Sequence, residues 1–138
     1  MLASAAVAHA LAVLLSAQRL GLGFDATVQV TAPPPLAPGE QGELSVTILD
    51  GPQLELPLSV RLSSARVILP ENRLGTRDVV DPLAQQPRVR ARFFAPAELG
   101  RHEVEGLVEY VTCREDRCRP RRARVVWQVE VVAPDPEP

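Results

Sequence analysis

The chain has 138 residues, of which 46% are hydrophobic and 23% are charged, and its formal net charge is -2. This composition suits one globular domain with a single core and excludes a disordered chain. The net charge gives no support to nucleic-acid binding, which normally requires a large basic surface.

The first segment, residues 1–17, is apolar and ends in small residues, as a signal peptide does at its cleavage site. It lacks a basic residue near its start and contains His9, so an N-terminal helix packed on the domain is the alternative. A membrane-spanning helix needs about 20 apolar residues, and this run ends at Gln18 and Arg19. We therefore expect export, with a mature chain that begins shortly after Ala17.

From residue 25 onward, runs with the alternation typical of strands recur between prolines and glycines. The expected strands cover residues 27–31, 43–48, 54–62, 67–69, 88–94, 101–112 and 121–132. Pro57 suggests an edge or a break in the third run, and residues 71–87 are expected to form a long loop. The pattern predicts an all-β domain over residues 25–132, an immunoglobulin-like antiparallel β-sandwich of about seven strands. A proline-rich tail follows at residues 133–138.

The last two expected strands have the clearest alternation. Their apolar faces predict burial of Val104, Val108, Tyr110, Val125, Trp127 and Val129. If the strands pair antiparallel with Cys113 facing Cys118, then Val104 faces Trp127, Val108 faces Ala123, and Glu109 faces Arg122. A shift of two residues would keep the same faces, so the alternation permits this register without establishing it.

Cys113 and Cys118 are the candidate functional residues, and two interpretations of them stay open. A disulfide between them would close a short loop and stabilise the fold by less than the roughly 3 kcal/mol assigned to a 15-residue loop. Nearby arginines, at positions 114, 117, 119, 121, 122 and 124, would favour a reactive thiolate. The alternative is an inert structural disulfide in an immunoglobulin-like interaction or assembly domain. No second ligand pair supports a zinc site, and no motif indicates a cofactor.

The spacing around the cysteines resembles a known family. Tyr110 precedes Cys113, four residues separate Cys113 from Cys118, and Pro120 follows. In this respect residues 100–120 resemble the end of the N-terminal periplasmic domain of the thiol:disulfide interchange protein DsbD, and the resemblance extends over about residues 25–132. It implies a periplasmic location, an immunoglobulin-like fold, and a redox pair formed by Cys113 and Cys118. That pair would accept electrons from a membrane-embedded donor and pass them to thioredoxin-fold proteins.

The resemblance also suggests how the pair would act. In the family, the second cysteine generally engages the partner, so Cys118 is expected to form the mixed disulfide and Cys113 to resolve it. The family covers its disulfide with an aromatic cap loop, whereas residues 71–87 contain no aromatic residue. We expect Leu74, Val79 or Val80 to take the place of that aromatic shield.

Overall fold

The computed structural model of the chain describes residues 27–135. The expected signal peptide at residues 1–17 and the last three residues of the tail lie outside this described range. Between residues 27 and 135, no helical segment has the length and hydropathy required to cross a bilayer.

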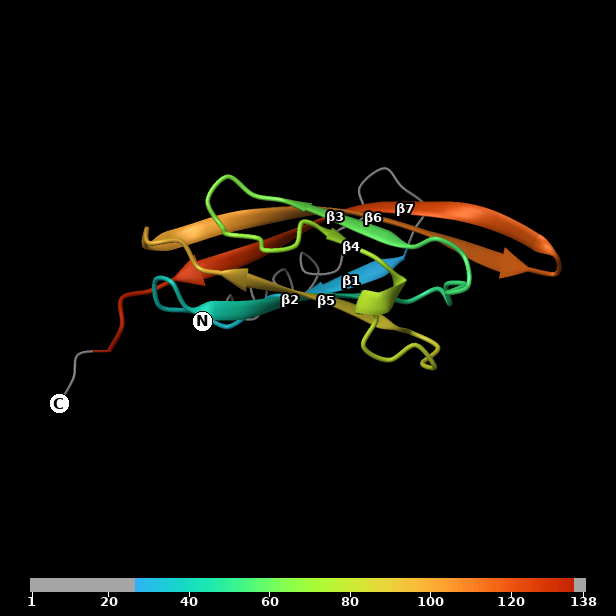
Figure 1. Cartoon of the computed structure of the whole chain (residues 1–138), viewed down its shortest axis with the longest axis horizontal. Coiled ribbons are helices and arrows are strands. Elements are labelled where there is room, and N and C mark those ends of the chain that lie inside the picture. The colour runs from blue at the N-terminus through green and yellow to red at the C-terminus, as the bar shows by residue number, and fades with distance from the viewer. Residues whose placement is uncertain (1–26, 136–138) are drawn as a thin grey trace, which may run out of the picture.

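Two antiparallel sheets pack face to face, as Figure 1 shows. One sheet has the order β1-β2-β5, with β1 at Val28–Thr31, β2 at Gln41–Ile48 and β5 at Arg88–Phe94. The other has the order β4-β3-β6-β7, with β4 at Arg73–Leu74, β3 at Ser59–Ser63, β6 at Gly100–Arg114 and β7 at Arg117–Val131. These seven strands of the described part of the chain confirm the predicted all-β sandwich of about seven strands.

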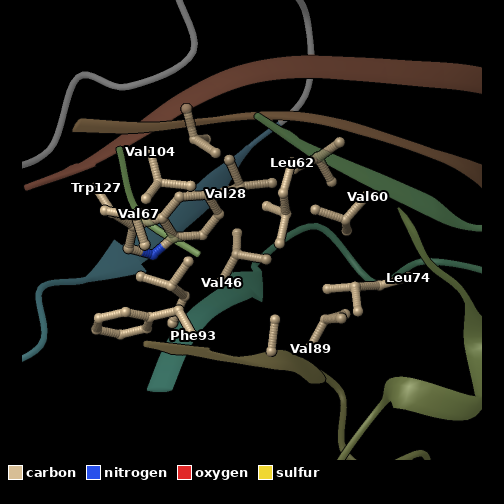
Figure 2. Close-up of a cluster of buried hydrophobic side chains, with 14 of the residues drawn as sticks. Val28, Val46, Val60, Leu62, Val67, Leu74, Val89, Phe93, Val104 and Trp127 are labelled. Atoms are coloured by element: carbon tan, nitrogen blue, oxygen red, sulfur yellow. The ribbon is translucent and has the colours of Figure 1, made fainter. Parts of the chain in front are cut away.

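The core lies between the two sheets and consists mainly of valine and leucine side chains (Figure 2). Every second residue of β5 and of most of β6 and β7 points into it, which is the arrangement that alternating hydrophobicity predicts. The six hydrophobic residues predicted to be buried in β6 and β7 are each at most 2% exposed. Trp127 also links the sheets, because its Nε1 donates a hydrogen bond to the carbonyl oxygen of Ser45 on β2, at 2.9 Å.

The hairpin of β6 and β7 has the register that places the two cysteines opposite each other. Val104 faces Trp127, Val108 faces Ala123, and Cys113 faces Cys118. The connecting turn consists of Glu115 and Asp116, whose φ angles are 50° and 65°. Positive φ at both central residues is the geometry of a type I′ turn, and a two-residue turn fixes the register of the strands that it joins.

The middle of the chain differs from the prediction. The strand expected over residues 54–62 begins only at Ser59. Pro57 cannot donate a hydrogen bond to a ladder. The residues before it form a turn, in which the N–H of Leu56 donates to the Gln53 carbonyl oxygen at 3.0 Å. The strand expected at 67–69 is a single bridge between Ile68 and Phe94. The predicted loop at 71–87 contains β4 and a 3-10 helix, η1, at Thr76–Asp78.

Candidate functional site

The disulfide lies near the tip of a hairpin that projects beyond the rest of its sheet. β6 and β7 are each 15 residues long, yet β3 pairs with β6 only at residues 105–109. Figure 1 shows the end of this hairpin extending past the neighbouring strands. The outer part of the hairpin is therefore held mainly by its own two strands.

Cys113 and Cys118 form a disulfide with their Cα atoms 4.0 Å apart. They are directly opposed in the ladder and lie on the face of the sheet that points away from the core. Cys118 is exposed to solvent, whereas Cys113 is half-buried. Of the two half-cystines, Cys118 is thus the one more open to a second molecule.

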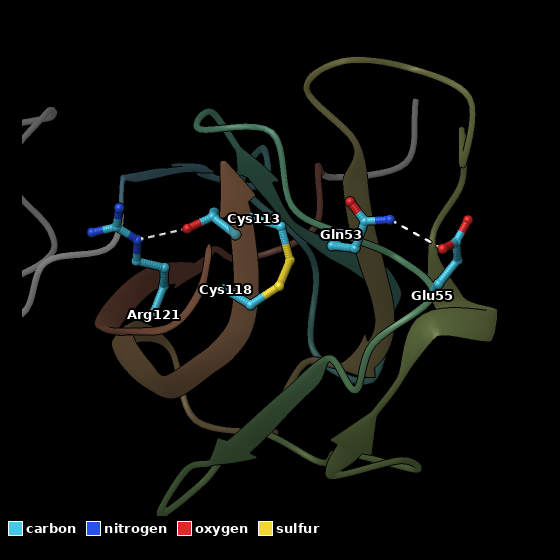
Figure 3. Close-up of a disulfide and its surroundings, with 6 residues drawn as sticks. Gln53, Glu55, Cys113, Cys118 and Arg121 are labelled. Carbon is cyan, nitrogen blue, oxygen red and sulfur yellow. Dashed lines mark hydrogen bonds between the residues drawn. A yellow bond between two sulfur atoms is a disulfide. The ribbon is translucent and has the colours of Figure 1, made fainter. Parts of the chain in front are cut away.

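The segment beside the hairpin follows the turn at Asp50 and Gly51. The N–H of Gln53 donates to the carbonyl oxygen of Val111, at 2.8 Å, which attaches this segment to β6 two residues before Cys113. Figure 3 shows Gln53 and Glu55 on this segment near the disulfide, with the Gln53 amide bonded to the Glu55 carboxylate at 3.1 Å. Residues 71–87 were predicted to lie beside the disulfide, and nothing in the sequence pointed to residues 51–58.

The side chains expected to shield the disulfide have other positions. Leu74 lies opposite Val60 in the sheet and is 4% exposed. Val79 bridges to Val89 on β5 and is 9% exposed. Both belong to the hydrophobic core, so their apolar surface is already used there. Val80 is 38% exposed, and its N–H bonds to the carbonyl oxygen of Arg88.

A surface pocket of about 440 Å³ lies on the same face of the hairpin as the disulfide. Its lining includes Val111 and Pro120, the first cross-strand pair on this face after the cysteines, and also Pro57. The next pair, Glu109 and Arg122, forms an ion pair at 3.4 Å at the pocket. Because two residues along a strand span about 7 Å, this pocket lies close to the disulfide. Its prolines and Val111 provide apolar surface, and the ion pair provides charge at its rim.

Tyr110 anchors the base of this hairpin. Its hydroxyl donates a hydrogen bond to Asp50 Oδ1 and accepts one from the N–H of Thr27, at 3.2 Å. Burial raises the pKa of Tyr110 well above its usual value, and the hydrogen bond to Asp50 and the charge of that carboxylate raise it further. The alternating pattern predicted that Tyr110 is buried, but partners 60 and 83 residues away leave no local signal in the sequence.

The same network continues to the residue before Cys113. Asp50 Oδ2 lies 4.0 Å from Arg121 Nε, and that nitrogen donates to Thr112 Oγ1 at 2.9 Å (Figure 3). The side chains of Asp50 and Arg121 are 24% and 23% exposed. These contacts connect the end of β2 to both strands of the hairpin and hold the base of the disulfide loop in place.

Positive charge is concentrated at the hairpin tip. From Cys113 through Arg122 the chain has five arginines but only two acidic residues, Glu115 and Asp116. Arg114 and Arg117 face each other across the strands next to the disulfide, and both are exposed. Cations close to a cysteine favour its thiolate form. After reduction, this environment would favour the nucleophilic state of the sulfur.

Within residues 27–135, no group of three or more His, Cys, Asp or Glu side chains is arranged to hold a metal ion. In comparisons with protein families, with curated proteins and with solved structures, nothing matches the chain. The chemistry of the site therefore has to be argued from the disulfide, its accessibility and its charged surroundings.

Proposed function

We propose that the chain is a periplasmic thiol-disulfide exchange module, which passes electrons through Cys113 and Cys118 to thioredoxin-fold partners. The observation that carries this proposal is a disulfide near the tip of a projecting hairpin, with Cys118 exposed to solvent. A disulfide that closes so short a loop contributes little to stability. Its position suits a bond that another protein can reach.

The reaction is a two-step exchange of sulfur bonds. In the reduced module, the Cys118 thiolate attacks one sulfur of a partner disulfide; the partner bond breaks, its second sulfur leaves as a thiolate, and a mixed disulfide forms. The Cys113 thiolate then attacks Cys118 Sγ, which breaks the mixed disulfide and releases the first partner sulfur as a thiolate. The partner has gained two electrons, and the module is now a disulfide. A membrane-embedded dithiol donor would reduce it again by the reverse exchange.

The proposed order of the cysteines rests on their exposure. An attacking thiolate must reach the partner sulfur, and Cys118 is exposed whereas Cys113 is half-buried. Arg117 and Arg119 flank Cys118 directly in the chain. Because nearby cations stabilise a thiolate, these arginines support Cys118 as the nucleophile and leave Cys113 as the resolving residue.

One observation favours the alternative, an inert disulfide in an interaction or assembly domain. Glu115 and Asp116 both have positive φ, and neither is glycine. For residues other than glycine this backbone region costs roughly 1–2 kcal/mol per residue. A covalent bond across the strands that flank this turn would help to hold the hairpin closed, which is a structural role.

Trapping the mixed disulfide tests the proposal. Purified Cys113→Ser and Cys118→Ser variants would be mixed with a thioredoxin-fold protein in its disulfide form and separated on a non-reducing gel. The double variant Cys113→Ser/Cys118→Ser is the control. We expect a covalent complex with Cys113→Ser, because this variant has no thiol of its own to resolve the mixed disulfide, and little with Cys118→Ser. Complexes of equal yield would refute the assigned order, and no complex with either single variant would favour the inert disulfide.

A further inference from the structure

Among the described residues, no strand pairs along the outer edge of β7. β7 ends the order β4-β3-β6-β7, so one side of it faces away from its sheet. At its far end, the N–H of Leu36 donates to the carbonyl oxygen of Glu130, at 3.0 Å, and the N–H of Val132 donates to the Leu36 carbonyl, at 2.8 Å. Among the described residues, no other segment makes a backbone hydrogen bond to the edge between residues 118 and 128.

The contact with Leu36 shows which backbone groups face outward. Because residues of an antiparallel strand alternate between the two sides, the outward carbonyl of Glu130 places the other even-numbered residues of β7 in the same orientation. Arg122, Arg124, Val126 and Gln128 therefore direct both N–H and C=O away from β6. Such a row of unpaired groups is a template for an added strand.

Several side chains along this edge are arginines. Arg119, Arg122 and Arg124 are all exposed. The ion pair of Arg122 with Glu109 compensates only part of this charge. Arginine and proline on an edge strand discourage pairing with a second copy of the same chain. An antiparallel second β7 would bring arginines close to arginines, and like charges opposite each other are destabilising.

We propose that the outer edge of β7, from Arg122 to Gln128, binds an extended acidic segment of a partner protein as an added β-strand. The backbone of that segment would continue the ladder, and its carboxylates would lie beside the arginines that repel a second copy. Pro120 interrupts the donors near the cysteine end, so the continuous part of the site runs from Arg122 to Gln128. This binding does not require thiol-disulfide exchange, and it can occur on the oxidised protein.

Amide hydrogen exchange on the whole oxidised chain tests the proposal. The probe is a synthetic peptide with uncharged, blocked termini, in which glutamate alternates with threonine and valine. We expect the peptide to slow exchange at the amides of Arg122, Arg124, Val126 and Gln128. The amides of Ala123, Val125 and Trp127 already bond to β6 and should change little. Binding that leaves the alternate amides unaffected, or the absence of any binding, would overturn the proposal.

Substitutions separate the backbone and charge contributions. Val126→Pro removes one outward N–H and leaves the ladder with β6 intact, as Pro120 does; Val126→Thr is the matched control that keeps the N–H. We expect Val126→Pro to weaken peptide binding about fivefold, the value of one hydrogen bond, and Val126→Thr to leave it unchanged. Equal affinity of the two variants would contradict strand addition. If Val126→Pro does not fold, the proposal is judged from the unmodified chain, by whether the peptide slows exchange at the alternate amides.

The charge contribution has its own control. Arg122→Gln/Arg124→Gln should weaken peptide binding several-fold and reduce its dependence on salt, because screened ion pairs are lost. The control Arg77→Gln/Arg92→Gln removes two exposed arginines outside β6 and β7 and should have no effect. If both double variants weakened peptide binding equally, the attraction would be nonspecific and the proposed site on β7 would be wrong. Concentration-dependent dimers that compete with the peptide would assign the edge to a second copy instead.

Discussion

Above about pH 10, the protein should lose stability through one residue, Tyr110. The residue is 2% exposed, and its hydroxyl donates to Asp50. Burial first, and then the hydrogen bond and charge of Asp50, hold its pKa well above the ordinary value of about 10. The unfolded chain therefore ionises near pH 10 while the folded chain keeps its proton. The contribution to stability is complete below pH 10 and is lost as the pH rises toward the folded pKa.

The expected loss follows from proton linkage. For one group whose unfolded pKa is about 10, the free energy of unfolding falls by about 1.4 kcal/mol at pH 11, with a slope that approaches about 1.4 kcal/mol per pH unit. Other titrations in this range are few, because the chain has one tyrosine and no lysine. The cysteines are in the disulfide, and arginine stays protonated.

Urea unfolding between about pH 9 and pH 11 measures this slope, and the absorbance of tyrosinate in the folded protein reports the titration itself. The control is Tyr110→Phe, which should be less stable at neutral pH by about 1–2 kcal/mol because the hydroxyl bonds are lost. Its stability should not show the additional alkaline decline. A folded tyrosine that ionises near pH 10, or equal slopes for both proteins, would refute the reasoning.

Two variants test the packing and the turn. A Cβ atom on Gly106 would lie 2.7 Å from Trp127 Cζ3, and the hydrogen bond to Ser45 holds that indole in place. Gly106→Ala should therefore lower the free energy of unfolding by about 1–3 kcal/mol. An unchanged midpoint in urea unfolding would contradict this close packing of Gly106 against Trp127. Glu115→Asn with Asp116→Gly suits the positive φ angles of the turn and should raise stability by about 1 kcal/mol. A lower midpoint in that double variant would show that the original turn residues are not strained.

The parts of the fold that could be predicted from the sequence are those with local patterns. Alternation along β6 and β7 predicted the buried face, and a two-residue turn then leaves a single register, with Cys113 opposite Cys118. The position of β4 could not be predicted, because Leu74 pairs with Val60 and the two-residue strand carries no period. The third strand was predicted to begin at residue 54, but β3 begins at Ser59. The alternating leucines at positions 54, 56 and 58 suggested a strand, although the backbone turns there.

The surroundings of the disulfide were less predictable than the disulfide. The arginines around it are visible in the sequence. The segment that contacts β6 could not be predicted, because its Gln53 N–H bonds to the carbonyl oxygen of Val111, which is far away in the sequence. The bond between Asp50 and the Tyr110 hydroxyl joins residues that are 60 positions apart. Nothing in the local sequence marks Tyr110 as a hydrogen-bonded residue, since its spacing is equally that of an ordinary core position.

The reduction potential of the pair formed by Cys113 and Cys118 tests the central claim most directly. The folded protein would be equilibrated in thiol buffers of known potential, and the reduced fraction counted by alkylation and mass measurement. Structural disulfides typically have potentials below about -300 mV, whereas exchange-active ones are more oxidising. A thiol-disulfide exchange module should give a value above about -300 mV, with the domain still folded when reduced. A value below about -300 mV, or unfolding on reduction, would contradict the exchange function and assign the bond a structural role.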